Sequence, residues 1–283
     1  MEKVYVPPLK IQGIKTKLVP LIRETAALDP DSVWVEPFMG SGVVGFNIKP
    51  RRALFADLNP HIIAFYNAVK SGGITAPLVR ACLEEQGALL AERGADYYYA
   101  VRERFNAYHN PLDFLFLNRS CFNGVVRFNR RGEFNTPYGH KPRRFSKAYI
   151  TKIVRQVEHM EECLKECDWR FVCQPYQDTI AAAPEDAFIY CDPPYIGRHV
   201  DYYDRWDEAS EKELCRLLRA SGRRFMLSTW EENRYRRNEY MDTLWGFCHK
   251  RGQAHFYHVG AREANRNAML EALMTNYNPA TAQ

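Results

Sequence analysis

The sequence VWVEPFMGSG, residues 33–42, decides the fold class. Its opening run, Val33 to Val35, is apolar and rich in β-branched and aromatic residues, which predicts a short buried strand. Gly40 and Gly42 then predict a tight turn whose backbone can approach a bound ligand closely. A second strand-like run ends at Asp57, about fifteen residues further on, where an acid is placed to accept hydrogen bonds from ribose hydroxyls.

Strand and helix patterns alternate along most of the chain. Further strand-like runs are found at residues 53–56, 170–172, 187–190 and 225–227. Helical patterns cover residues 60–70, 77–93, 146–165 and 210–220. This alternation predicts an α/β fold with a doubly wound, Rossmann-like parallel sheet, whose ligands bind outside the carboxyl ends of the strands. We also expect residues 255–258 and 270–277 to pair as an antiparallel hairpin at the sheet edge.

About a hundred residues separate the second strand from the third, which is too long for a simple crossover. We therefore predict that residues 71–147 form an inserted, mainly helical domain ending in a hairpin around Arg131 and Gly132, and that residues 1–70 and 148–283 form the catalytic domain. The segment from Asn118 to Arg155 contains ten basic residues and one acid, a net charge of +9. The chain as a whole carries +5, so the remaining residues carry −4. Aromatic and amide residues interleave with these arginines, which favours a nucleic-acid surface over a solvated face.

The tetrapeptide Asp192-Pro193-Pro194-Tyr195 directly follows the strand-like run 187–190 and Cys191. Two prolines fix the backbone and remove two amide donors, so a carboxylate, a carbonyl oxygen and an aromatic ring are presented together on a rigid turn. This set suits a planar amino group on a heteroaromatic ring. Asp192 and the Pro193 carbonyl can accept its two hydrogens and so release the nitrogen lone pair for attack, while Tyr195 stacks on the base.

Composition excludes several classes of protein. Of the 283 residues, 46% are hydrophobic, but no apolar run approaches the ~20 residues that a membrane span needs. The N-terminal residues lack a basic segment followed by an apolar stretch, so we expect a cytoplasmic protein. Eight cysteines occur without a C-x-x-C pair, and no acids or histidines cluster at metal-ligand spacing. We therefore expect no metal site, and a nuclease is disfavoured.

Taken in order, these segments resemble the Dam-like class of DNA adenine-N6 methyltransferases, which use S-adenosylmethionine. The resemblance runs from Pro8 to Lys15, through Glu36 to Gly42 and Asp57, and on to the Asp192 turn. It also includes the segment Phe134-Asn135-Thr136-Pro137-Tyr138-Gly139. The departures are Ile11, where the family usually has tryptophan, and Pro175-Tyr176, where it has an Asp-Phe pair near the cofactor adenine.

The resemblance implies roles for individual residues. Phe38 would border the methionine part of the cofactor, Asp57 would bind its ribose, Lys15 would close over its carboxylate, and Gln174, Gln177 or Asp178 would replace the missing aspartate. The full set of expected cofactor-binding residues is Ile11, Gln12, Lys15, Glu36, Pro37, Phe38, Gly40, Ser41, Gly42, Asp57, Leu58, Tyr176 and Asp192. The expected DNA-binding residues are Arg119, Asn123, Arg127, Asn129, Arg130, Arg131, Asn135, Tyr138, Lys141, Arg143 and Arg144.

The sequence thus predicts an enzyme that transfers methyl from S-adenosylmethionine to N6 of adenine in double-stranded DNA by base flipping and direct transfer. The resemblance also implies a place in a restriction-modification system, with a cognate restriction endonuclease as partner. Two alternatives stay open. The first is methylation of another amino group, on RNA adenine, cytosine N4 or protein glutamine, and the second is a catalytically silent DNA-binding subunit.

Overall fold

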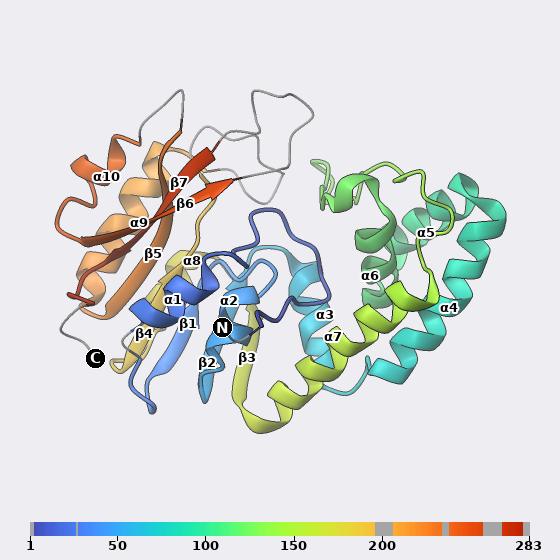
Figure 1. Ribbon diagram of the computed structural model, residues 1–283, viewed down its shortest axis with the longest axis horizontal. Helices are drawn as coiled ribbons and strands as arrows, with labels where there is room; N and C mark the ends of the chain where they lie inside the picture. Colours follow the sequence, from blue (N-terminus) through green and yellow to red (C-terminus); the bar gives the residue numbers. More distant parts are fainter. Residues whose placement is uncertain (1–2, 27, 196–205, 234–237, 257–267, 280–283) are drawn as a thin grey trace.

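The computed structural model describes residues 3–26, 28–195, 206–233, 238–256 and 268–279. Within these ranges one sheet has the strand order β3-β2-β1-β4-β5-β7-β6 (Figure 1). Its strands are β1 (Val33–Glu36), β2 (Arg52–Asp57), β3 (Asp168–Cys173), β4 (Ala187–Cys191), β5 (Arg224–Asn233), β6 (His249–Phe256) and β7 (Ala268–Thr275). The first five strands run parallel, and β7 pairs antiparallel with both β5 and β6. The predicted doubly wound Rossmann-like sheet is confirmed.

Two apolar cores lie on the two faces of the sheet. One contains residues of α1 (Val19–Thr25), α2 (Val43–Ile48) and α3 (Pro60–Lys70). The other contains residues of α8 (Tyr176–Ala181), α9 (Glu208–Ser221) and α10 (Tyr240–Thr243). Trp34 belongs to the first core and Val35 to the second, because successive side chains of a strand point to opposite faces. Continuous apolar runs in the sequence therefore produce strands buried on both faces.

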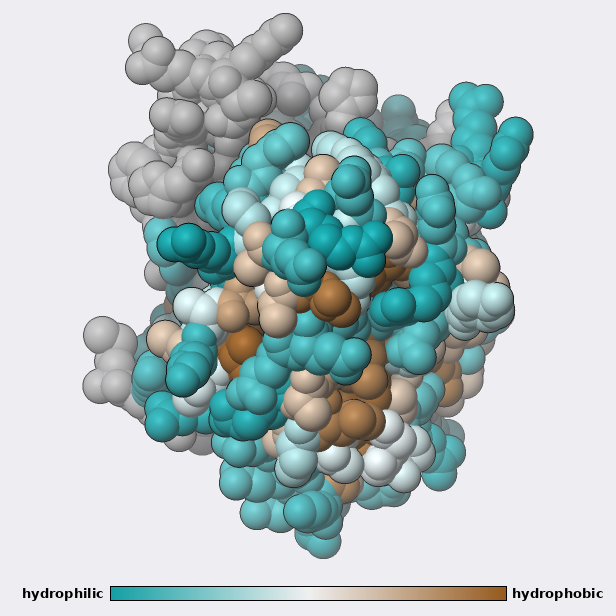
Figure 2. All heavy atoms as spheres, turned by 90° about the vertical axis from the view of Figure 1, so that its right-hand side faces the viewer, coloured by the Kyte–Doolittle hydropathy of each residue, from teal (hydrophilic) through white to brown (hydrophobic). Residues whose placement is uncertain are grey.

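The segment between β2 and β3 forms a helical lobe beside the sheet (Figure 1). It consists of α4 (Ala76–Arg93), α5 (Ala95–Tyr108), α6 (Pro111–Ser120), η1 (Phe122–Gly124) and α7 (Lys147–Glu166). We predicted an insertion ending at residue 147, but α7 begins there and packs against α4 before returning the chain to β3. Seen from the lobe, the surface is mostly hydrophilic, and hydrophobic side chains are confined to small areas (Figure 2).

Most predicted elements are confirmed, and two details are wrong. The predicted edge strand 255–258 begins earlier, because β6 pairs with β7 from His249 to Phe256, and residues 257 and 258 lie outside the described part of the chain. The helix predicted to begin at Ser210 begins at Glu208, because the Asp207 side chain accepts the Ser210 amide and caps it. None of the helices in the described ranges is long and apolar enough to cross a membrane.

Candidate active site

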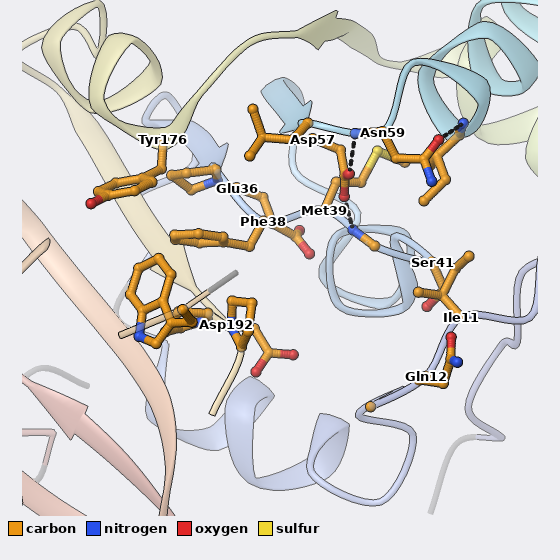
Figure 3. Close-up of a pocket in the computed structure, with 18 of the residues that line it drawn as sticks. Ile11, Gln12, Glu36, Phe38, Met39, Ser41, Asp57, Asn59, Tyr176 and Asp192 are labelled. Carbon is orange, nitrogen blue, oxygen red and sulfur yellow. Dashed lines mark hydrogen bonds between the residues drawn. The ribbon is translucent and has the colours of Figure 1, made fainter. Parts of the chain in front are cut away.

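A cavity of about 500 Å³ lies where β1, β2 and β4 end (Figure 3). The glycine turn after β1 and the turn 192–195 after β4 both line it, although they are far apart in the sequence. They meet because β1 and β4 are parallel neighbours whose carboxyl ends reach the same edge of the sheet. Every predicted catalytic residue lines this cavity, and so does every predicted cofactor-binding residue except Gly42.

Glycines and one acid shape the turn after β1. Gly40 and Gly42 have φ of 50° and 69°, the left-handed region that glycine adopts readily. A Cβ atom on Gly42 would also come within 3.0 Å of the Met39 side chain. Asp57 accepts hydrogen bonds from the backbone amides of Gly40 and Asn59, each at 2.8 Å (Figure 3). Its carboxylate therefore holds the turn in position while lining the cavity.

The Asp192 carboxylate points into the cavity from the end of β4 (Figure 3). Its Oδ1 accepts a hydrogen bond from Ser228 at 2.9 Å and forms an ion pair with Lys15 Nζ at 3.1 Å. Burial raises the pKa of Asp192, and the opposing effects of Lys15 and Ser228 only partly offset this rise. Lys15 lines the cavity as well, so its predicted place at the carboxylate of the cofactor stays a prediction.

Glu36 provides a third carboxyl group to the cavity, at the end of β1. It is 2% exposed, and the Trp34 indole donates a hydrogen bond to it at 3.0 Å. Burial, with Asp192 and Asp57 nearby, raises its pKa to about 8. The group is therefore mostly protonated at neutral pH, so it can donate a hydrogen bond to a ligand as well as accept one.

Three aromatic rings form one wall of the cavity: Phe38, Tyr176 and Trp206. Phe38 stacks on Tyr176 with centroids 5.3 Å apart, and Trp206 lies edge-on to Phe38 at 5.5 Å. The Trp206 indole donates to the buried carboxylate of Glu211 at 2.7 Å, which fixes the ring. Trp206 could not be predicted as a site residue, because nothing in the sequence distinguishes it from an ordinary core aromatic next to a helix.

The three residues proposed to replace the family aspartate differ in position. Gln177 lines the cavity, whereas Gln174 and Asp178 do not. The Gln174 side chain donates to Thr179 at 3.0 Å, within its own segment. Of the three, Gln177 is therefore the residue placed to reach a ligand.

The cavity also extends to the helical lobe. Val126 and Phe128, which belong to the segment between η1 and the hairpin, line it together with Ile62 of α3. Gln12 accepts the Val126 amide at 3.4 Å and so joins the N-terminal segment to the same place. This connection could not be predicted from the sequence, because apolar side chains such as Val126 and Phe128 are typical of an ordinary core.

The predicted hairpin around Arg131 and Gly132 is confirmed. The amides of Asn129 and Gly132 bond to the carbonyls of Glu133 and Asn129, and Phe128 bridges Phe134 across the turn. The Asn129 side chain binds Arg131 and Glu133 of the same turn, so it shapes the hairpin. The predicted DNA-binding residues with exposed side chains are Asn123, Arg127, Arg130, Arg131, Lys141 and Arg143. Asn135 is half-buried and accepts from Arg127 at 2.7 Å.

Two predicted DNA-binding residues, Arg119 and Tyr138, are buried, and a third, Arg144, is half-buried. Arg119 is 4% exposed and donates to Gln156 at 2.8 Å, inside the lobe. Tyr138 is 3% exposed, with its ring packed 5.2 Å from Tyr98. Arg144 is half-buried and binds the Arg119 carbonyl and the Tyr149 hydroxyl. Burial contradicts a direct DNA contact by Arg119 and Tyr138, because the composition of a segment does not reveal which side chains point inward, whereas a contact by Arg144 stays a prediction.

The arrangement expected of the Dam-like methyltransferases is present, because the glycine turn, Asp57 and the Asp-Pro-Pro-Tyr turn line one cavity of a Rossmann-like sheet. Comparison with known families agrees. The family described as D12 class N6 adenine-specific DNA methyltransferase matches residues 12–264, and this chain belongs to it.

Curated relatives are similar over part of their length. The chain is 38% identical over 193 residues to DNA adenine methylase of Serratia marcescens, covering 66% of each protein. It is 36% identical over 196 residues to DNA adenine methylase of Haemophilus influenzae, covering 67% of this chain and 63% of the relative. It is 39% identical over 166 residues to DNA adenine methylase of Escherichia coli K12, covering 57% of this chain and 55% of the relative. The matches therefore span less than two thirds of these relatives.

Among solved structures, an rRNA methyltransferase, aviRa, from Streptomyces viridochromogenes is matched with a TM-score of 0.37 and 12% identity. The match covers 100% of this chain and 90% of that one. A likeness at this level carries no information about substrate.

Proposed function

We propose that the protein transfers a methyl group from S-adenosylmethionine to N6 of adenine in duplex DNA. The observation that carries the proposal is that the turn 192–195 and the glycine turn line one cavity. The side with the aromatic wall and the acidic groups suits a nucleoside. The side formed by the turn 192–195 suits a planar amino group. Membership in the D12 class supports adenine as the acceptor.

The lining of the cavity fits S-adenosylmethionine chemically. Tyr176 and Trp206 offer ring faces to an adenine, and Gln177 is placed to bond its amino group. Asp57 would accept from the ribose hydroxyls, and the largely neutral Glu36 can bond to either the amino or the carboxylate group of the methionine part. When bound, this cofactor supplies a methyl group on a positively charged sulfur.

Asp192 and the Pro193 carbonyl would hold the acceptor nitrogen. Lys15 and Ser228 both contact Oδ1 of Asp192, so we assign Oδ2 to one hydrogen of the adenine amino group. The Pro193 carbonyl accepts the other hydrogen, which localises the lone pair on the nitrogen. Tyr195 stacks on the extruded base, and the carboxylate of Asp192 is the acceptor for the proton that the nitrogen must lose.

The helical lobe would bind the DNA. We assign residues 71–147 to target recognition, with the exposed cations Arg127, Arg130, Arg131, Lys141 and Arg143 contacting phosphates or base edges. We add Asn123 to this set, because its amide side chain is exposed. Asn135 is assigned to the orientation of Arg127 through their hydrogen bond.

A transfer assay with tritium-labelled S-adenosylmethionine tests the substrate. We expect label in duplex DNA at adenine N6, with RNA and protein unlabelled. Label in RNA, in cytosine or in protein glutamine would instead support the other amino-group methyltransferases. Calorimetry showing no cofactor binding would support a silent DNA-binding subunit. Mapping methylated adenines in DNA from cells expressing the protein, and digesting that DNA with endonucleases, tests the proposed restriction-modification role.

A further inference from the structure

A buried carboxylate lies behind the cavity, on an antiparallel strand that the sequence analysis did not connect with the chemistry. Glu271 belongs to β7 and is 1% exposed. It does not line the cavity itself. Burying a carboxylate costs free energy unless charged or polar partners compensate, so its contacts are informative.

Two contacts connect Glu271 with groups that do line the cavity. The Tyr195 hydroxyl donates to Glu271 Oε1 at 3.0 Å, in a fully buried hydrogen bond. Lys15 Nζ lies 3.8 Å from the same oxygen and 4.9 Å from the centre of the Tyr195 ring. A single carboxylate oxygen therefore lies beside both the ring and the ammonium.

The same ammonium reaches the proposed catalytic carboxylate. Lys15 Nζ is 3.1 Å from Asp192 Oδ1 and is also held by the Gly13 carbonyl at 3.0 Å. Lys15 thus lies between two carboxylates, the half-buried Asp192 at the end of β4 and the buried Glu271 in β7. Leu273, two residues along β7 on the same face of the sheet, is a core side chain, so a carboxylate at position 271 is exceptional there and depends on the partners that compensate its charge.

We propose that Glu271 is a positioning residue for methyl transfer: it holds the Tyr195 ring through its hydroxyl and shares the Lys15 ammonium with Asp192. Through these contacts it sets the orientation and charge of the groups that meet the acceptor base. The inference rests on the proposed function, because Glu271 acts through Tyr195 and Asp192.

Two substitutions of Glu271 separate charge from hydrogen bonding. Glu271→Gln keeps an oxygen that accepts from Tyr195 but removes the negative charge. Glu271→Leu removes both. Glu231→Gln is the matched control, since Glu231 is a β5 carboxylate that pairs with Lys250 of β6 away from the cavity.

The measurements are single-turnover transfer to duplex DNA at saturating cofactor across a pH series, the cofactor Kd by calorimetry, and the Tm. We expect the rate constant to fall about tenfold in Glu271→Gln and about a hundredfold in Glu271→Leu, while the cofactor Kd stays within about twofold. Glu231→Gln should match the wild type.

The pH profile distinguishes positioning from a merely structural role. Glu271 is one of the charges that raise the pKa of Asp192. Its removal should therefore shift the acid limb of the rate profile to lower pH in both variants. The other ionisable groups that interact with Asp192 are Lys15, Glu36, Tyr190 and Cys191, and all are unchanged by the substitution.

Two results would overturn the inference. The first is a wild-type rate and pH profile in both variants. The second is a loss of rate that follows the loss of cofactor affinity or Tm, with the acid limb unmoved. A wild-type protein that transfers no methyl group to DNA would instead contradict the proposed function, and the role of Glu271 would fall with it.

Discussion

The cavity and the basic hairpin differ in how their charged side chains are held. Around the cavity, Lys15, Asp192 and Glu271 are held by ion pairs and hydrogen bonds with little exposed surface. In the hairpin, Arg130 and Arg131 extend into solvent. The first arrangement fixes the position of every atom, and the second leaves side chains free to adapt.

This difference teaches what each region is built to do. Aligned groups in a low-dielectric site are worth far more to a reaction than the same groups in water. Exposed cations suit a polyanion, because phosphate contacts draw their free energy largely from counterion release and tolerate variable geometry. Changes at the cavity should therefore alter chemistry or folding, whereas changes at the hairpin should alter DNA affinity.

The largest effect is expected at Asp192. Asp192→Ala removes the acceptor for an amino hydrogen, and we expect the transfer rate to fall at least about 10³-fold. The cofactor Kd should stay nearly unchanged. Single-turnover transfer and calorimetry measure the two quantities. Undiminished transfer would refute the role given to Asp192.

Glu36 should make the free energy of unfolding of the protein depend on pH. Its pKa is raised from 4.5 to about 8, so the folded protein binds this proton more tightly than the unfolded chain does. The folded state is therefore destabilised as pH rises from about 4.5 to about 8, at up to roughly 1.4 kcal/mol per unit. Glu36→Gln should remove a few kcal/mol of this loss. Urea unfolding of the cofactor-free protein at pH 5 and pH 9 tests it, and an equal pH dependence in wild type and variant would contradict it.

A substitution of Arg119 tests whether a buried cation of the lobe contributes to stability or to DNA binding. Arg119→Ala leaves Gln156 without its donor and opens a cavity in α6, so we expect a loss of about 2 kcal/mol in the free energy of unfolding. The salt dependence of DNA binding should not change. If the variant had wild-type stability and a smaller slope of log DNA affinity against log salt, Arg119 would instead be a DNA-binding residue.

The smallest effect is expected at the hairpin. Replacing Arg130 and Arg131 together with Ala should weaken DNA binding about tenfold and reduce the slope of log affinity against log salt by up to about 2. The transfer rate of the bound complex should stay unchanged. Anisotropy titrations at several salt concentrations measure the slope, with Lys212→Ala on α9 as the control. An unaltered slope would place the DNA elsewhere.

Local patterns predicted much of the fold and the centre of the site. Apolar runs of strand length and the helical patterns over residues 60–70 and 146–165 led to the right elements, because these signals act within a few residues. The segments 36–42 and 192–195 were recognisable since proline and glycine restrict or free the backbone locally. The start of β6 was missed because the pairing partner β7, and not its own sequence, sets its length.

By itself, the sequence determined which segments carry the chemistry and that they follow parallel strands. Only the tertiary structure decided which side chains share the site: it brought Trp206 and Glu271 to the cavity region, paired Lys15 with Asp192 and turned Arg119 inward. The physical reason is that backbone propensities are local, whereas burial and ion pairing depend on neighbours distant in the chain.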